Sequence, residues 1–275
     1  MKNKIWCIND EFGNILNLEG FKCKGNDEYG TQLLIQGLGC ECKTIWCDYV
    51  KSYANSYNKR NIISFDGRGI GKSDSEIVSS TQIVDDTVQV LLKEKPPYQL
   101  IGHSLGGMIA LKVAERIPEL VDSVILICSN PRYTKNAKKG FLWRADEIKN
   151  NNSIDCIFEK VIPRSFSRNF IQNEHEKVLT FKNMLNRQNI KNYCKLSLIA
   201  STVDALDVFQ KLNIPILMIV GSEDPSITVE KTRKYADMIN CDFKVIADSG
   251  HNIPLENPES LREIIENFDN LFRRF

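Results

Sequence analysis

The sequence has no long apolar run and no segment with the features of a secretion signal. None of its apolar stretches approaches the ~20 residues that a helix needs to cross a bilayer. The first residues, 1–6, lead directly into mixed polar and apolar residues. These absences argue against a membrane-spanning or exported protein, so we expect a cytoplasmic one. A chain of 275 residues is close to the upper size of one core, which predicts one large domain or a core with an insertion.

An excess of charge of one sign is also missing. The chain has 36 Lys and Arg against 35 Asp and Glu, and its formal net charge is +1. Such a balanced chain has no overall field to attract nucleic acid or a membrane surface. We therefore expect neither of them as a partner.

Histidine is scarce, and the cysteines follow no pattern. The three histidines are dispersed, and the nine cysteines are an odd number with scattered spacing. This spacing argues against a disulfide framework and suits a reducing compartment. The closest pair, Cys40 and Cys42, lacks the second pair of ligands that a structural zinc site would need. We predict no metal site and no cofactor.

Several short apolar runs are bounded by glycine or polar turns, and segments with helical spacing lie between them. Runs of this length without alternation are typical of strands buried on both faces. Their alternation with helices predicts an α/β fold with a mainly parallel central sheet flanked by helices. Residues 1–30, which contain the turn-like segment 10–14, look more like an antiparallel hairpin. The predicted buried strands are 32–36, 61–65, 98–101, 124–128 and 214–220.

The strand and helix rhythm fails between residues 131 and 210. This segment has helix-like patches but no clear buried strand, so we predict a helical cap inserted into a core formed by residues 1–130 and 211–275. The segment holds 14 Lys and Arg against 8 Asp and Glu. The excess fits either a solvated helical surface or a preference for an anionic or carrier-bound substrate. Its aromatic residues either face the substrate or, for most of them, pack the insert: Phe141, Trp143, Phe158, Phe166, Phe170 and Tyr193.

The strongest local motif is Gly102-His103-Ser104-Leu105-Gly106, which follows the predicted strand 98–101 and precedes a predicted helix. A serine on a sharp turn from strand to helix presents its hydroxyl to a substrate, and the small residues beside it let the chain turn. The start of the helix supplies free N–H groups and a partial positive charge for a developing oxyanion. His103 is expected to pack away from the reactive side, and His175 to be solvated in the cap.

With this motif the chain resembles the α/β-hydrolase family over nearly its whole length. Residues 33–39, Leu-Leu-Ile-Gln-Gly-Leu-Gly, match the strand and oxyanion loop of that family, and residues 66–73 look like its Asp-x-Arg-Gly-x-Gly-x-Ser turn. The resemblance implies that the backbone N–H groups of Leu38 and Leu105 form an oxyanion hole. Gln36 departs from the family, where histidine is usual. We expect Gln36 to brace the loop, although a misformed hole and a weak enzyme remain the alternative.

The resemblance also supplies the partners of Ser104. Asp224 follows an apolar segment that ends at Val220, and the family pattern places the acid there, with Glu223 as the near alternative. His251 lies in the loop after 243–246. The order Ser, Asp, His is the one expected for this fold. Histidine has a pKa near the working pH and can activate the serine, while the carboxylate fixes its tautomer.

Residues 67–73 also imitate a phosphate-binding loop because they end in Gly-Lys-Ser after a predicted strand. The spacing is wrong, since Asp66 stands where such a loop needs glycine, and its carboxylate would repel phosphate. A nucleotide-dependent function therefore stays a remote hypothesis.

These patterns predict a serine hydrolase that cleaves a small-molecule carboxylic ester, lactone or thioester through a Ser104 acyl-enzyme. A carbon–carbon bond hydrolase is a less favoured reading, because the fold alone does not define the bond. In the family, haloalkane dehalogenases and epoxide hydrolases use aspartate at the position of Ser104, which argues against both. The rival hypothesis is a hydrolase-like protein that binds a ligand beneath its cap without turnover. The residues predicted to line the substrate pocket are Gln36, Trp143 and Phe166.

Overall fold

The structure, a computed structural model, describes residues 1–9, 13–53, 59–74 and 79–272. Within these residues the centre of the protein is an eight-stranded sheet in the order β1-β2-β4-β3-β5-β6-β7-β8. β1 with β2 and β2 with β4 pair antiparallel, and the remaining neighbours pair parallel. The strands are β1 (Lys2–Asn9), β2 (Ile15–Cys23), β3 (Thr31–Ile35), β4 (Asn61–Phe65), β5 (Tyr98–His103), β6 (Val121–Ile127), β7 (Ile216–Gly221) and β8 (Asp242–Ile246).

The prediction of an α/β fold with a mainly parallel sheet is confirmed. Each short apolar run coincides with one of β3 to β7, and every residue of β4, β5 and β7 is buried. The predicted N-terminal hairpin is the antiparallel pair of β1 and β2. Residues 10–12 of its expected turn lie outside the described residues.

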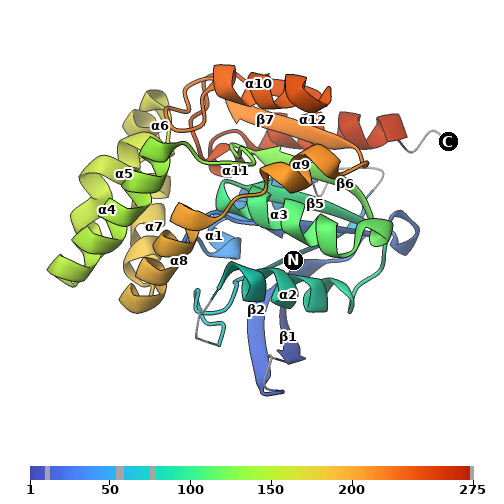
Figure 1. Ribbon diagram of the computed structural model, residues 1–275, viewed down its shortest axis with the longest axis horizontal. Coiled ribbons are helices and arrows are strands. Elements are labelled where there is room, and N and C mark those ends of the chain that lie inside the picture. The colour runs from blue at the N-terminus through green and yellow to red at the C-terminus, as the bar shows by residue number, and fades with distance from the viewer. Residues whose placement is uncertain (10–12, 54–58, 75–78, 273–275) are drawn as a thin grey trace.

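Helices cover both faces of the sheet (Figure 1). α1 packs against α11 and α12, whereas α2 packs against α3, and α3 also contacts α9. Ser79 caps the start of α2 by accepting a hydrogen bond from the N–H of Gln82. The helices of this layer are α1 (Cys42–Tyr53), α2 (Ser80–Leu91), α3 (Leu105–Arg116), α9 (Leu206–Lys211), α10 (Val229–Ile239), α11 (Ile253–Glu256) and α12 (Pro258–Phe272), with short 3-10 helices η1 (Asp27–Tyr29) and η2 (Pro118–Leu120).

Between β6 and β7 the chain forms a second group of helices, which gather at one side of the sheet (Figure 1). Because they follow the carboxyl end of β6, they lie over the edge where parallel strands of an open α/β sheet present ligand sites. We call α4 to α8 the inserted helices. Their bounds are α4 (Lys135–Asn151), η3 (Asp155–Ile157), α5 (Phe158–Ser165), α6 (Arg168–Asn173), α7 (His175–Asn186) and α8 (Ile190–Thr202).

α4 and α8 pack closely together within this group, and α7 contacts α1 of the core. Arg187, at the end of α7, forms a two-pronged ion pair with Glu41, with N–O distances of 2.7 and 2.6 Å. α9 begins within the segment 131–210, ends at Lys211 and packs against α3. The division of the chain into a core and a cap at those residues stays a prediction. Among the helices of the described residues, none is both long and apolar enough to cross a membrane.

Candidate active site

Ser104 lies on the sharp turn between β5 and α3. Its backbone has φ 55° and ψ −120°, a conformation that is strained for any residue with a side chain. A Cβ atom at position 102 would lie 2.4 Å from the backbone of residues 106 and 107, and one at position 106 would lie 2.3 Å from the carbonyl oxygen of Ile35. Only glycine fits at these two positions, so the Gly-x-Ser-x-Gly spacing is a packing requirement of this turn.

The structure brings three side chains that are distant in the sequence into one hydrogen-bonded chain. His251, in the loop after β8, places Nε2 2.9 Å from Ser104 Oγ and Nδ1 2.6 Å from Asp224 Oδ2. Asp224, after β7, is buried, and its other oxygen accepts hydrogen bonds from the N–H groups of Ser226 and Ile227 at 2.8 and 2.9 Å. The exposed side chain of Glu223 instead accepts a hydrogen bond from the N–H of Arg168.

Asp224 and His251 shift each other's pKa values so that the charged form of each is favoured. Burial lowers the pKa of His251, but the charge of Asp224 and their hydrogen bond raise it to a net value above the usual range. Burial raises the pKa of Asp224, but the charge of His251, their hydrogen bond and the two backbone N–H groups hold it below its usual range. Asp224 is therefore ionised at neutral pH, and His251 is a stronger base than a free imidazole.

Two backbone N–H groups near Ser104 are available to a ligand. In the described part of the chain, neither the N–H of Leu38 nor that of Leu105 donates a hydrogen bond. Leu105 is the first residue of α3, where helical N–H groups have no partner within the helix. Gly37 brings the loop after β3 close to the serine, since a Cβ atom there would lie 3.1 Å from Ser104 Cβ.

Gln36 connects the loop after β3 to the neighbouring strand. Its Nε2 donates a hydrogen bond to the carbonyl oxygen of Phe65 at 2.8 Å, and its Oε1 accepts one from Ser64 Oγ at 3.4 Å. The side chain therefore ties the end of β3 to the end of β4. It does not line the cavity that contains Ser104, contrary to its predicted place in a substrate pocket.

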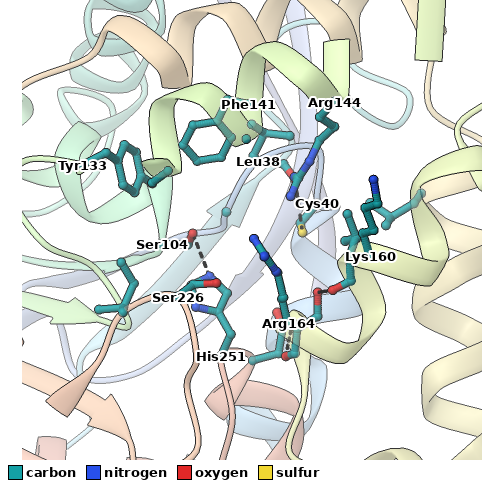
Figure 2. Close-up of a pocket in the computed structure, with 18 of the residues that line it drawn as sticks. Leu38, Cys40, Ser104, Tyr133, Phe141, Arg144, Lys160, Arg164, Ser226 and His251 are labelled. Atoms are coloured by element: carbon teal, nitrogen blue, oxygen red, sulfur yellow. Dashed lines mark hydrogen bonds between the residues drawn. The ribbon is translucent and has the colours of Figure 1, made fainter. Parts of the chain in front are cut away.

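A cavity of about 440 Å³ opens onto Ser104 and His251, between the core and the inserted helices (Figure 2). Of the predicted pocket residues Trp143 lines it, whereas Phe166 lies outside its wall, because Phe166 packs against Phe170 and Phe181 with ring centroids 5.0 Å apart in both pairs. The sequence interpretation named Phe141 and Tyr193 only as aromatic residues of the cap. The lining residues that it missed include Cys40, Tyr133, Arg144, Lys160, Arg164 and Asn252.

Two of the missed residues could not be found from a local motif. Tyr133 is buried beside Ser104; burial raises the pKa of its hydroxyl, and the nearby Ser104 hydroxyl partly offsets that rise. Arg144 is one of many basic residues of the inserted helices, and its spacing does not distinguish it from those that face solvent. The only sequence signal for it was the positive charge of the whole segment.

The other two histidines lie in different surroundings. His103 is buried, lines the cavity, and holds Nε2 2.8 Å from the backbone carbonyl oxygen of His251. Burial lowers its pKa to about 3, so it is neutral at any working pH. His175 is the exposed first residue of α7.

One group of side chains near the serine has the composition of a metal site. The ligand atoms of Cys128, Asp224 and His251 lie within 4.8 Å of one another. Burial raises the pKa of the Cys128 thiol well above its usual range, so the thiol stays protonated and is a poor ligand. Asp224 and His251 already bind each other. The group therefore fits a hydrogen-bonded chain better than a metal centre.

The segment 66–73, which imitates a phosphate-binding loop, has contacts of a structural kind. Ser73 Oγ donates a hydrogen bond to the carbonyl oxygen of Asp66 at 2.6 Å and accepts one from the N–H of Glu19 at 2.9 Å. Lys72 and Ser73 do not begin a helix. A phosphate-binding loop needs a helix at that point, because the N–H groups of its first turn bind the phosphate.

The fold and this site define the class of the protein. A family model for the α/β-hydrolase fold matches residues 33–258, and the chain belongs to that family. The turn at residues 102–106 that carries Ser104, which we call the elbow, lies inside the matched range, as do the two free amides and the other two members of the hydrogen-bonded chain.

Three individual proteins illustrate the likeness. The chain is 28% identical to the uncharacterized hydrolase YugF of Bacillus subtilis over 183 residues, which cover 62% of this chain and 64% of that protein. It is 22% identical to 3-oxoadipate enol-lactonase 2 of Acinetobacter baylyi over 226 residues, or 81% of this chain and 82% of the relative. Among solved structures, a thermophilic esterase from Thermogutta terrifontis, with malate bound, superposes with a TM-score of 0.86 over 98% of both chains at 22% identity.

Proposed function

We propose that the protein is a serine hydrolase that cleaves a small-molecule carboxylic ester, lactone or thioester through an acyl-enzyme on Ser104. The observation that carries the proposal is the continuous hydrogen-bonded chain from Ser104 through His251 to Asp224 at the wall of a cavity. The relatives support the class of reaction, because their names include an enol-lactonase and an esterase. Ester and lactone hydrolysis are therefore favoured over thioester hydrolysis.

In the first half of the reaction Ser104 Oγ attacks the acyl carbon, and its proton passes to His251 Nε2. The bond between the acyl carbon and the leaving oxygen or sulfur then breaks, and the leaving group takes the proton from His251. Asp224 stays ionised and stabilises the imidazolium that forms between these two steps. The 2.9 Å contact between Ser104 Oγ and His251 Nε2 is within the reach that the proton transfer requires, and the 2.6 Å contact with Asp224 holds the ring in place.

The negative charge of the tetrahedral intermediate would be bound by the N–H groups of Leu38 and Leu105. Each such donor contributes about 3 kcal/mol to the transition state in an enclosed site. The N-terminal end of α3 adds its partial positive charge at the same place. The bracing of the loop by Gln36 supports a formed oxyanion hole rather than a misformed one.

In the second half, water attacks the acyl-enzyme. His251 takes a proton from the water, the bond between the acyl carbon and Ser104 Oγ breaks, and the serine oxygen takes that proton back. The products are a carboxylic acid and the free enzyme. The inserted helices act as a cap that encloses the substrate, and a cavity of about 440 Å³ suits a small molecule.

The test is labelling with a fluorophosphonate, which reacts with an activated serine. We expect the native protein to be labelled on the peptide that contains Ser104, and Ser104→Ala to remain unlabelled. Ser153→Ala, which changes a serine outside the cavity lining, serves as the matched control and should be labelled like the native protein. Equal labelling of native protein and Ser104→Ala would refute the proposal.

The rival hypothesis, a binding protein without turnover, predicts a different result. Such a protein would bind esters in the cavity but would show neither labelling of Ser104 nor a burst of product with an activated ester. The sequence argument for this rival was the glutamine at position 36, and the contacts of Gln36 with Phe65 and Ser64 weaken that argument.

A further inference from the structure

The cavity next to Ser104 is lined by four basic side chains. Lys139 and Arg144 come from α4, and Lys160 and Arg164 come from α5. Among the described residues that line it, none is an aspartate or a glutamate. Arg144 is half-buried, whereas Lys139, Lys160 and Arg164 are exposed, so solvent screens Arg144 the least.

Arg144 is the most enclosed of the four. It is half-buried, its Nη1 donates a hydrogen bond to the Tyr193 hydroxyl at 3.3 Å, and its Nε is buried without a partner. Its guanidinium carbon lies 5.7 Å from the centre of the Phe141 ring, which holds the side chain over the cavity. Its charge acts to lower the pKa of Cys40, which burial raises. Arg144 is therefore a guanidinium without a carboxylate partner, held at the cavity wall within the described structure.

Arg164 reaches into the same cavity from α5, and Figure 2 shows its side chain and that of Arg144 extending toward the middle of the cavity from opposite sides. Lys160 lies beside them, with Nζ 4.3 Å from the centre of the Trp143 ring. In the described part of the chain neither Arg164 nor Lys160 forms an ion pair with a carboxylate. Two guanidinium groups that line one cavity repel each other, and an anion bound between them relieves that repulsion.

We propose that this cavity selects substrates that carry a carboxylate in addition to the scissile ester, and that Arg144 and Arg164 bind that carboxylate. The guanidinium group is suited to this role, because its planar donors match the two oxygens of a carboxylate. Arg144, Arg164 and Ser104 line the same cavity, so the carboxylate belongs to the same small molecule as the ester. This proposal names the substrate class of the site proposed above and rests on that function.

Arg144 also influences the pKa of His251, and a bound carboxylate would change that influence. The charge of Arg144 acts to lower the pKa of His251, against the larger effect of Asp224. A carboxylate bound to Arg144 neutralises that opposing charge. A charged substrate would thus leave the base stronger than an uncharged one would.

The experiment compares charged esters with neutral partners of the same shape, using the Ser104→Ala variant so that binding is measured without turnover. The probes are monomethyl glutarate against dimethyl glutarate, with the carboxylate on the acyl side, and acetoxyacetate against its methyl ester, with the carboxylate on the alcohol side. Titration calorimetry should give at least one charged ester a dissociation constant about tenfold or more below that of its neutral partner. The pair that shows the difference identifies the side of the substrate that carries the charge.

Variants then test the two arginines. Arg144→Gln and Arg164→Gln, each combined with Ser104→Ala, should reduce the preference for the charged ester about tenfold. Lys149 lies at the exposed end of α4, the helix of Arg144, but outside the cavity lining. Lys149→Gln removes one positive charge there and should leave the preference unchanged. Arg164 is exposed, so its replacement keeps the test valid if Arg144→Gln does not fold.

The proposal is overturned if neither charged ester binds more tightly than its neutral partner, or if both arginine variants keep the full preference. Failure of the underlying hydrolase function has a different signature. In that case charged esters bind selectively, but fluorophosphonate does not label Ser104 in the native protein.

Discussion

His103 Nε2 lies 2.8 Å from the backbone carbonyl oxygen of His251. A carbonyl oxygen only accepts hydrogen bonds, and the buried His103 ring is neutral because burial lowers its pKa to about 3, so Nε2 carries the proton and donates. The residue that precedes the elbow serine therefore holds the loop that carries the proposed base. His103 does not touch the reacting atoms, and its role is to position His251.

Removing this donor should slow the reaction of Ser104. We expect His103→Leu to lower the rate of fluorophosphonate labelling by about 10- to 100-fold, since a small displacement of the base is costly. His103→Gln places an amide N–H near the position of Nε2 and should restore most of the rate. Circular dichroism checks that both variants are folded. If the leucine and glutamine variants react at the same rate, His103 does not position the loop through this hydrogen bond.

The pH dependence of ester hydrolysis should report the pKa of His251. The imidazole acts as a base only when it is unprotonated, so kcat/KM falls as the pH drops through its pKa. Burial lowers the pKa of His251, but the charge of Asp224 and its hydrogen bond raise it by more, so the net pKa is above that of a free imidazole and activity is lost at a higher pH on the acidic side. Steady-state rates between pH 4 and 9 with a neutral ester measure it.

Replacing the acid tests which carboxylate raises the pKa of His251. Asp224→Asn removes the charge, so the acidic limb of the pH profile of kcat/KM should move to lower pH. At the same time kcat should fall about 10⁴-fold through loss of the correct tautomer. Glu223→Gln is the matched control, because Glu223 is the adjacent acid, and it should leave the limb in place. A limb that moves with Glu223→Gln and not with Asp224→Asn would contradict the assignment.

The sequence and the structure agree where the chain satisfies local rules. Strands β3 to β7 were predictable because each is a short apolar run with almost every residue buried, whereas β8, which is mostly exposed, was not among the predicted buried strands. The elbow was predictable because Gly102 and Gly106 have no room for a side chain. Only the resemblance to the family assigned Ser104, Asp224 and His251 to one site, because spacing along the sequence says nothing about distances across loops. The residues that line the cavity were harder to predict from the sequence. Arg144 lies on α4 and Phe166 directly after α5, and only the packing of the inserted helices decides which of the two faces the substrate.

Gln36 is the position where this chain departs from the usual histidine, and a variant should show what the glutamine does. Gln36→Leu removes the hydrogen bonds to Phe65 and Ser64 and loosens the loop that carries the N–H of Leu38. We expect kcat to fall about tenfold, with KM nearly unchanged, because the oxyanion is bound in the transition state rather than in the ground state. Steady-state kinetics with a neutral ester separate the two parameters.

A control and a contrary result complete this test. Gln210→Leu changes an exposed glutamine on α9 and should leave both parameters as they are. A rise in KM at constant kcat in Gln36→Leu would mean that the Gln36 side chain helps to bind the substrate, as its predicted place in the substrate pocket implied.

Arg68 and Asp86 form a buried ion pair that connects the loop after β4 to α2. Arg68 Nε lies 2.7 Å from Asp86 Oδ2, Nη2 lies 2.6 Å from Oδ1, and both side chains are at least 94% buried. Removing one partner leaves the other charge in a poorly solvated place. Arg68→Met should therefore lower the free energy of unfolding by about 3–5 kcal/mol, measured by urea denaturation.

The double variant separates the value of the pair from the cost of an unpaired charge. Arg68→Met with Asp86→Leu fills the same space with apolar atoms, so it should recover most of the stability lost by Arg68→Met alone. Arg116→Met breaks a half-exposed ion pair between Arg116 of α3 and Asp85, the neighbour of Asp86 on α2, and should cost about 0.5 kcal/mol or less. If the double variant is no more stable than the single one, Arg68 stabilises the protein through contacts other than its pairing with Asp86. If Arg68→Met is as stable as the native chain, the turn at 66–73 does not depend on this ion pair.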